Sequence, residues 1–473
     1  MSGTILYGSF FLLIAAILFY TAFQFYRSNN FKLSLGLITL GGLLMRIFTS
    51  LDPFLHEWDE RYHALVAKNL TKHPLLPTFY DVPILEQDLL WVGGHVWLHK
   101  QPLTLWLIAG SLELFGVSDF AVRLPSILLS TAMIVLTYYI GKSLFGSKEG
   151  IIAAFFIAVN GLFIELSAGR IATDHVDICF AFFIELAILF AIKHRQNLNL
   201  KWVIPMSVSI GLAILAKWLP ALIVIPVWLL LTYNKSNWKI SLLPLSVCLI
   251  ITSAVFIPWQ VYIHTSFPVE AAHEQAMNWR HFTEALEDQT GPFYYFFHRI
   301  MVNYGELVYI PLIWFLFSKR TTVLKTNYRA LLIWILIPMV FFSIPITKMQ
   351  GYVLFIAPAL FIITAYFINN INSVSTLANK PWLSRLVIFL FFFLAFRYSV
   401  ERIKPFQERD TPEWKTEILE LKASHSGEKL VIFNCEHYAE AMFYTNFIAY
   451  DRIPNENDLA KVKAAGYNYL ILE

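Results

Sequence analysis

The sequence predicts an all-α polytopic membrane protein of about 11–13 transmembrane helices, followed by a small C-terminal α/β domain. Hydrophobic residues make up 57% of the 473 residues, and only 15% are charged. A soluble domain carries roughly 25% charged residues, so the composition excludes an ordinary soluble fold. The apolar residues also come in blocks of about 17 to 25, the length that crosses a bilayer core of about 30 Å.

The apolar blocks give the order of the predicted spans. The first block lacks a basic flank and a small-residue cleavage site, so it is interpreted as a retained span and not as a signal peptide. The predicted spans lie near residues 4–26, 31–50, 123–141, 150–167, 178–193, 203–217, 219–233, 241–262, 293–317, 330–347, 350–370 and 385–400.

Charged loops between these spans predict the orientation of the chain. Every second short loop is basic, for example at Lys142 and Lys148. Basic loops face the cytoplasm in most membrane proteins. The loops 51–122 and 263–292 and the tail therefore face outward, together with 168–177 and 348–352. The net charge of +3 and the lack of a basic tract argue against nucleic acid as a partner.

Segment 102–117 is apolar but short, and it contains Pro102, Gly110, Glu113 and Gly116. If it crossed the membrane, every later loop would change sides and the basic loops would face outward. We therefore interpret it as a re-entrant or interfacial helix.

Asp59 and Glu60 lie just after a predicted span and open a segment with helical spacing of apolar residues up to Leu70. Charge beside a membrane is either a solvated loop or a functional site. A carboxylate at a helix start is also favoured as a cap, which accounts for one acid but not readily for two. The pair could supply a general base, a metal ligand, or both.

His95 and His99 are four residues apart, so on a helix they would share one face and could hold a divalent metal with a carboxylate. Two glycines and two tryptophans nearby make an interfacial loop an equally good interpretation. A divalent metal is thus the one candidate cofactor.

Three cations lie where outer loops meet the membrane: Lys100, Arg280 and Lys348. Each alone is typical of a surface residue whose charged end reaches the interface. Together they could bind a phosphate or pyrophosphate through charge-assisted hydrogen bonds. Tyr352, four residues after Lys348, could add a phenolic donor or simply belong to the aromatic belt.

Arg170 and Asp174 are also four residues apart and could form an ion pair. Such a pair at the membrane edge is either structural or catalytic.

An ordered series of short motifs resembles the dolichyl-phosphate-mannose protein mannosyltransferase superfamily, whose bacterial branch includes the aminoarabinose transferases that modify lipid A. The series covers about residues 31 to 370, and its specificity comes from the order of the motifs. The motifs are the Asp59-Glu60 pair, HKQPL at 99–103, FAVRLPS at 120–126, GKSLFG at 141–146, RIATD at 170–174, GLAILAK at 211–217, PW at 258–259, RHFT at 280–283, GPFYY at 291–295 and KMQGY at 348–352.

The resemblance implies a GT-C fold glycosyltransferase of the kind found in glycosyltransferase families 39 and 83. It implies that Asp59 is the general base. Glu60 and Asp174 are grouped with it as candidate catalytic residues: Glu60 either caps the helix or assists a metal, and Asp174 matches a recurrent acid of the family with an open role. The lipid phosphate, which is the leaving group, would be surrounded by Lys100, Arg123, Arg280, Lys348 and Tyr352. A base on one side of the anomeric carbon and charge stabilisation on the other are what inverting transfer requires.

This chain departs from the superfamily pattern at three places. The frequent KPPL motif is Lys-Gln-Pro-Leu here, and His99 stands where aminoarabinose transferases have Glu. The usual Arg-Arg-Phe is Arg280-His281-Phe282, and the span near 4–26 lies outside the matched region.

The tail from about residue 401 has a soluble composition. Segments 429–434 and 467–472 are predicted strands, with helices near 411–423, 436–445 and 456–465. Strands alternating with helices indicate a small α/β domain. We therefore predict a transmembrane domain over 1–400 and an extracytoplasmic accessory domain over 401–473.

These observations predict a hexosyl- or pentosyltransferase that moves a sugar from a polyprenyl-phosphate donor to an extracytoplasmic acceptor. The acceptor would be lipid A, another glycolipid, a glycan or a protein hydroxyl, and the expected location is a bacterial inner membrane. The alternative is a transporter or flippase of a lipid-linked sugar. Transporters usually bind near the bilayer midplane within repeats, whereas the ionisable groups here cluster at one interface, which favours the enzyme.

Overall fold

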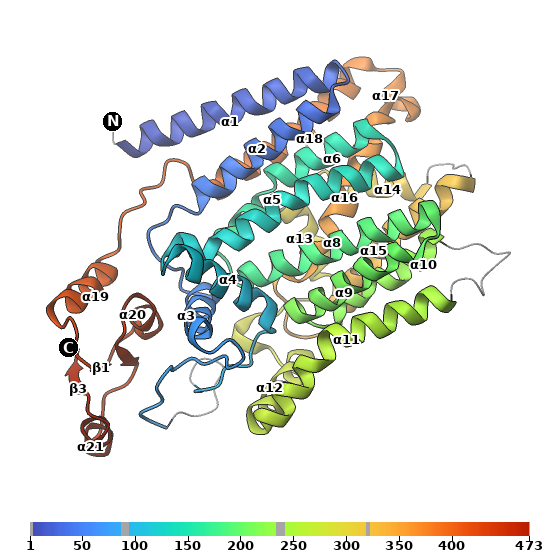
Figure 1. The fold of residues 1–473 in the computed structure, drawn as a ribbon. Helices are drawn as coiled ribbons and strands as arrows, with labels where there is room; N and C mark the ends of the chain where they lie inside the picture. Colours follow the sequence, from blue (N-terminus) through green and yellow to red (C-terminus); the bar gives the residue numbers. More distant parts are fainter. Residues whose placement is uncertain (1–2, 87–93, 233–241, 318–321, 473) are drawn as a thin grey trace.

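The computed structural model describes residues 3–86, 94–232, 242–317 and 322–472, and it consists mainly of a bundle of long helices (Figure 1). The helices of the bundle are α1 (Gly3–Arg27), α2 (Phe31–Thr49), α3 (Asp59–Lys72), α4 (Pro102–Phe115), α5 (Asp119–Leu144), α6 (Ser147–Val159), α7 (Gly161–Ser167), α8 (Asp174–Asn197), α9 (Val203–Lys217), α10 (Val224–Thr232), α11 (Leu242–Ser266), α12 (Pro268–Thr283), α13 (Tyr295–Tyr304), α14 (Tyr309–Phe317), α15 (Thr322–Ser343), α16 (Ala357–Asn369), α17 (Ser375–Ala378) and α18 (Pro381–Ile403). Short 3₁₀ helices adjoin them at η1 (Leu200–Trp202), η2 (Leu219–Ile223), η4 (Leu286–Asp288), η5 (Gln350–Ile356) and η6 (Ile371–Ser373).

The number of helices that could cross a membrane reaches the lower end of the predicted 11–13 only when each bent pair of helices is counted as one span. In the described part of the chain, nine helices are long and apolar enough to cross a membrane, or up to 11 if two bent pairs each form one span. Each predicted span has a helical counterpart, the shortest being Leu219–Thr232. α8 and α16 lie at the buried centre, whereas α1, α11 and α18 face outward. The protein is therefore an integral membrane protein.

Two of the predicted spans are broken. α6 and α7 meet at 50°, and α13 and α14 at 113°. At the first break Asn160 accepts a hydrogen bond from the backbone N–H of Phe163 and donates one to the carbonyl of Asn303 in α13. The side chain of Arg46 donates to the carbonyls of Ile157 and Ala158 in the last turn of α6. Buried polar side chains thus satisfy the backbone where a helix stops inside the bundle.

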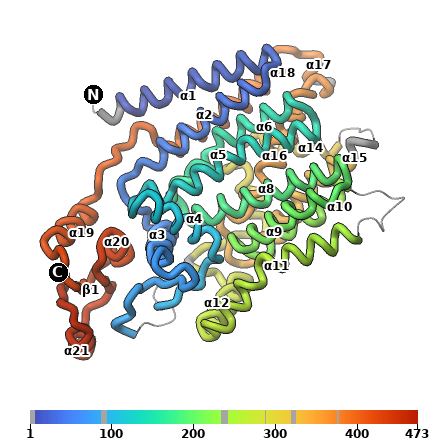
Figure 2. Tube along the Cα trace, viewed as in Figure 1, coloured from blue at the N-terminus to red at the C-terminus, as the bar shows by residue number. Residues whose placement is uncertain are grey.

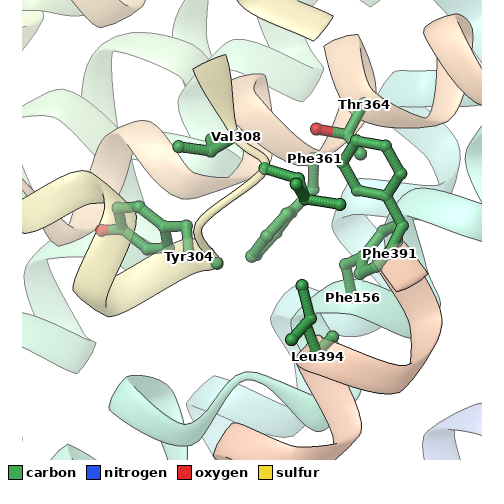
Figure 3. Close-up of a pocket in the computed structure, with 10 residues that line it drawn as sticks. Phe156, Tyr304, Val308, Phe361, Thr364, Phe391 and Leu394 are labelled. Carbon is green, nitrogen blue, oxygen red and sulfur yellow. The ribbon is translucent and has the colours of Figure 1, made fainter. Parts of the chain in front are cut away.

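A pocket of about 10 Å³ lies beside the break between α13 and α14. Its lining is apolar and includes Phe156, Val308 and Phe361 (Figure 3). One buried water needs about 10–15 Å³, so this space is a packing gap without room for a substrate.

α4 is 14 residues long and lies outside the set of membrane-crossing helices. It begins at Pro102, where the missing N–H costs nothing, and it ends at Gly116, whose φ of 82° suits glycine. This short helix fits the predicted re-entrant or interfacial segment, with its buried residues packed against α3 and α5.

The polar elements gather at one end of the bundle. Figures 1 and 2 show α3, α12 and the C-terminal domain at this end, with α17 and the turn between α1 and α2 at the opposite end. The turn between α1 and α2, which is flanked by Arg27 and Lys32, is thus separated from α3 and α12 by the length of the bundle, as the alternating loop charges predict.

The C-terminal domain contains a three-stranded parallel sheet in the order β2-β1-β3. Its elements are α19 (Glu413–Ser424), β1 (Leu430–Phe433), α20 (Tyr438–Tyr444), β2 (Ile448–Tyr450), α21 (Glu456–Ala464) and β3 (Asn468–Ile471). The predicted helices and two predicted strands are present, and β2 is the strand that the prediction missed. The buried residues of β1 and α20 form one hydrophobic cluster with those of α3, so the domain does not depend on a core of its own.

Candidate functional site

A cavity of about 570 Å³ opens at the polar end of the bundle. This volume lies within the range of about 300–1,000 Å³ that is usual for small-molecule sites. Its lining comes from the start of α3, the loop before α4, the start of α8, the end of α9 with η2, the helix α12 with η4, the end of α15, and the segment that leads into η5. The polar side chains that line it include Asp59, His99, Lys100, Gln101, Thr173, Lys217, His281 and Tyr352.

Asp59 is the first residue of α3, where the positive end of the helix dipole favours a carboxylate. Its Oδ2 accepts a hydrogen bond from the backbone N–H of Thr173 at 2.7 Å and lies 3.6 Å from Nζ of Lys100. Burial raises the pKa of Asp59, but the charges of Lys100 and His63 and the Thr173 hydrogen bond hold it below its usual range. The carboxylate is thus ionised at the cavity wall, and its role as a base stays a prediction.

Thr173 was not predicted as a site residue, and its backbone explains why it matters. Its φ is 71°, a left-handed conformation that is uncommon outside glycine and costs about 1–3 kcal/mol. This conformation turns its N–H toward Asp59, while its hydroxyl donates to Asp177. The hydrogen bond from this backbone N–H therefore holds the carboxylate of Asp59 in one position.

Lys217 ends α9 and forms an ion pair with the buried Asp177 of α8. Its Nζ lies 4.6 Å from the ring centre of Tyr352. Only glycine fits at position 351 beside this pair, because the Cβ of any other residue would lie 2.2 Å from Oδ2 of Asp177 and clash with it. The sequence offered one signal for Lys217: it is a cation at the outer end of a predicted span, inside a matched motif.

Glu60 and Arg123 form a structural pair, which corrects their predicted roles. Arg123 Nε lies 2.7 Å from Glu60 Oε1, and Nη2 lies 2.9 Å from Oε2. Both side chains are fully buried, and Arg123 also donates to the carbonyls of Ser50, Asp52 and Phe54. Because its donors are occupied and it does not line the cavity, Arg123 is not a phosphate ligand in this structure. Glu60 anchors the loop before α3.

Asp174 does not line the cavity either. It is fully buried, and its Oδ1 lies 2.9 Å from Nδ1 of His63, one helical turn after Asp59. The predicted pair of Arg170 with Asp174 is also wrong, because Arg170 forms two hydrogen bonds with Asp52 at 2.8 and 3.1 Å. Asp174 therefore supports the wall behind Asp59.

The remaining predicted cations lie beside the cavity without lining it. Arg280 is exposed, and its Nε lies 2.8 Å from Oε2 of Glu284, the residue that follows the end of α12. Lys348 is buried and donates to the carbonyl of Pro345. Among the predicted phosphate-binding residues, Lys100 and Tyr352 line the cavity.

The two histidines of the predicted metal site do not lie on a helix. His95 Nδ1 contacts the carbonyl of Tyr80 at 2.8 Å, and His99 Nδ1 lies 3.3 Å from Glu274 of α12. Over the described residues, no three His, Cys, Asp or Glu side chains are arranged to hold a metal ion. The residues present therefore do not fit the predicted site, and metal dependence stays a prediction.

The helical bundle with its small outer domain belongs to the same class of fold as two solved structures. The structure of ArnT from Cupriavidus metallidurans bound to undecaprenyl phosphate superposes with a TM-score of 0.65 at 15% identity, covering 90% of this chain and 87% of that one. The Archaeoglobus fulgidus oligosaccharyltransferase superposes with a TM-score of 0.61 at 13% identity, covering 88% of this chain and 64% of that one. At these identities the likeness concerns the fold.

The sequence comparisons agree with this class. The family described as dolichyl-phosphate-mannose-protein mannosyltransferase matches residues 99–262. An uncharacterized protein of Aquifex aeolicus is 28% identical over 66% of this chain, and a putative mannosyltransferase of Bacillus subtilis, YycA, is 22% identical over 51%. Undecaprenyl phosphate-alpha-4-amino-4-deoxy-L-arabinose arabinosyl transferase 2 of Pseudomonas fluorescens is 24% identical over 64%. The chain spans 59%, 33% and 54% of these relatives' lengths, and the predicted resemblance is confirmed.

Proposed function

We propose that this protein is a membrane glycosyltransferase that moves one sugar from a polyprenyl-phosphate donor to an extracytoplasmic acceptor. A single observation carries the proposal: an ionised carboxylate and two cations line the same cavity at the end of a membrane-embedded bundle. Asp59 supplies the carboxylate, and Lys100 and Lys217 supply the cations. Transfer of a sugar from a phosphate ester requires these two functions side by side.

Asp59 accepts the proton of the acceptor hydroxyl as the oxygen attacks the anomeric carbon. The bond from that carbon to the phosphate oxygen breaks, and the phosphate leaves with both electrons. In this structure, Nζ of Lys100 lies 3.6 Å from Oδ2 of Asp59. A bound phosphate draws the charge of Lys100 toward itself, which raises the pKa of Asp59 and strengthens it as a base.

The leaving phosphate is stabilised by Lys100 and Lys217, and the hydroxyl of Tyr352 donates a hydrogen bond to it. Charge-assisted hydrogen bonds of this kind are about twice as strong as neutral ones. Lys217 extends the phosphate-binding set predicted from the sequence. Arg280 and Lys348 adjoin the cavity and would join this set only if their side chains turned from their present partners.

The rest of the cavity fits a lipid-linked donor. One part of its lining is apolar and aromatic, with the residues Trp218, Leu219, Pro220, Phe341 and Phe342. An isoprenoid chain buries against such a surface without polar cost. The sugar is a hexose or a pentose in this proposal, and the acceptor is a lipid, a glycan or a protein hydroxyl. The site and the C-terminal domain face the outside of a bacterial inner membrane.

The test compares Asp59→Asn with wild type after reconstitution with labelled polyprenyl-phosphate sugars and candidate acceptors. Loss of a general base lowers the rate by about 10²–10⁴-fold, so we expect a decrease of at least 100-fold with intact thermal unfolding. The matched control is Asp410→Asn, an exposed carboxylate outside the cavity. Equal transfer by Asp59→Asn and wild type would rule out Asp59 as the base. Movement of the labelled lipid across the bilayer without transfer would favour the transporter alternative.

A further inference from the structure

A second cavity lies between α3, the loop 78–82 and the C-terminal domain. Its volume is about 140 Å³, and its polar lining includes Lys72, Asp81 and Asn446. One water needs about 10–15 Å³, whereas sites for drug-sized molecules start at about 300 Å³. The cavity therefore has room for one ring-sized ligand.

The walls of this cavity are fixed by side chains of α3. Asn69 Nδ2 donates to the carbonyls of Thr78 and Phe79 at 2.9 and 3.1 Å, which holds the loop against the helix. Lys68 Nζ donates to the carbonyls of Met442 and Phe443 at 2.8 and 3.0 Å, at the end of α20. A pocket whose walls are held this way loses little entropy when a ligand binds.

The lining combines aromatic rings with planar polar groups. Tyr80 and Tyr467 contribute aromatic side chains, and Asn446 and Asp81 contribute an amide and a carboxylate. A pyranose ring offers C–H faces that pack on aromatic rings and hydroxyls that both donate and accept. An amide or a carboxylate can bind two neighbouring hydroxyls at once. We propose that this cavity binds a pyranose ring of a saccharide, as a carbohydrate site separate from the transfer cavity.

Other ligand classes fit the lining less well. An anion would need free cations, but Lys68 already donates to three backbone carbonyls, the third of them at Thr445, and Lys72 pairs with Asp81. A lipid chain would cover the Lys72–Asp81 pair and the amide of Asn446 with apolar groups in place of water, which is costly. A neutral, hydroxyl-rich ring satisfies both the polar and the aromatic parts.

The cavity is distinct from the transfer site although both use α3. Asp59 begins the helix, and Asn69 is ten residues later, about 15 Å along its axis at about 1.5 Å per residue. Leu65, Lys68, Asn69 and Lys72 follow the i, i+3, i+4, i+7 spacing of one helix face, and they line this cavity. A saccharide bound here therefore contacts the same helix as the base, but not the base itself.

The test measures saccharide binding to the full chain in lipid nanodiscs, since sugar-based detergents would compete. The probes are the methyl glycosides of glucose, mannose, galactose and glucuronic acid, followed by saturation-transfer NMR and calorimetry. The pocket variants are Asn446→Ala and Tyr467→Ala. Their matched controls are Asn457→Ala, an exposed residue of α21, and Tyr469→Ala in β3, neither of which lines the cavity.

We expect at least one glycoside to bind, each pocket variant to weaken binding about tenfold, and each control to retain it. Asp59→Asn should bind the glycoside as wild type does, which separates this site from the transfer cavity whether or not transfer is observed. The proposal is overturned if no glycoside binds, if the pocket variants bind as wild type does, or if Asp59→Asn alone abolishes binding. Binding of a peptide in place of every glycoside would also overturn it.

Discussion

At the scale of single residues, the cavity depends on groups that are far apart in the sequence. Asp59 meets the backbone N–H of Thr173 and the ammonium group of Lys100, and Lys217 meets Asp177. In each pair a charge that would be costly to bury alone has a partner within reach. The chemistry of the site therefore depends on these pairs of interacting groups. A substitution of one member also changes the environment of the other.

The pH dependence of transfer follows from the lowered pKa of Asp59. An aspartate has an ordinary pKa of about 3.9, and the folded value lies below it. Because the pKa is depressed by folding, the stability that this group contributes is present above about pH 3.9 and is lost as the pH falls through the folded value. We expect kcat/KM to show no acidic limb from Asp59 between pH 5 and 8, measured with a labelled donor. A limb centred near pH 6 that disappears in Asp59→Asn would contradict the lowered pKa of Asp59, although not its role as the base.

The Lys217–Asp177 pair gives a double-mutant test. Lys217→Met leaves the carboxylate of Asp177 buried without a counter-charge, so we expect a loss of about 3–5 kcal/mol in stability, seen as a lower midpoint of thermal unfolding. Adding Asp177→Asn removes that charge and should restore most of the midpoint, while transfer stays low because the phosphate still lacks Lys217. Full recovery of transfer in the double variant would show that Lys217 acts only through folding.

At the scale of elements, the C-terminal domain contacts both α3 and the loop that precedes it. Arg61 lies 3.3 Å from Glu440 of α20, and the backbone N–H of Leu55 donates to the hydroxyl of Tyr444 at 3.0 Å. Lys415 of α19 donates to the carbonyl of Pro53 at 2.7 Å. These contacts flank Asp59 on each side, so the outer domain fixes the loop and the helix that carry the base.

Tyr444→Phe tests this clamp. The hydroxyl serves both Leu55 and Asp119, and its removal leaves a buried N–H without a partner, which costs about 1–3 kcal/mol. We expect a lower unfolding midpoint and faster hydrogen exchange in residues 52–58 by mass spectrometry. Tyr469→Phe, at a partly exposed tyrosine, should stay within about 0.5 kcal/mol of wild type. Unchanged exchange in the loop would show that the domain does not hold it.

At the scale of the whole molecule, the two ends of the bundle differ in charge and chemistry. The cavity, α12 and the C-terminal domain lie at one end, and α17 and the turn between α1 and α2, flanked by Arg27 and Lys32, lie at the other. A donor with a long apolar tail can then lie in the bilayer while its phosphate reaches the charged end of the bundle.

Cysteine accessibility tests this orientation. The native cysteines Cys179, Cys248 and Cys435 are buried, so a single introduced thiol can be labelled without first removing them. We expect Lys148→Cys and Lys325→Cys to react with an impermeant maleimide only after the membrane is opened, and Asn446→Cys to react in intact cells. Labelling of Lys325→Cys from outside would reverse the topology.

Much of the architecture was predictable because it rests on local pattern. Block length and hydropathy predicted the spans, and Pro102 and Gly116 predicted the short α4. In the C-terminal domain the alternation of strands and helices was correct, but β2 has only three residues and gives almost no pattern of its own. The residues 87–93, which hold part of the predicted outer loop with Asp88, lie outside the described range.

The sequence by itself determined the class of fold, the end of the molecule where the polar groups lie, and the positions of Asp59, Lys100 and Tyr352 as site candidates. Only the tertiary structure decided which charges are paired inside the protein. It assigned Glu60 to Arg123 and Asp174 to His63, and it brought Lys217 into the cavity. The reason is physical: hydrophobic length acts along the chain, whereas the partner of a buried charge is chosen by packing between helices that are distant in sequence.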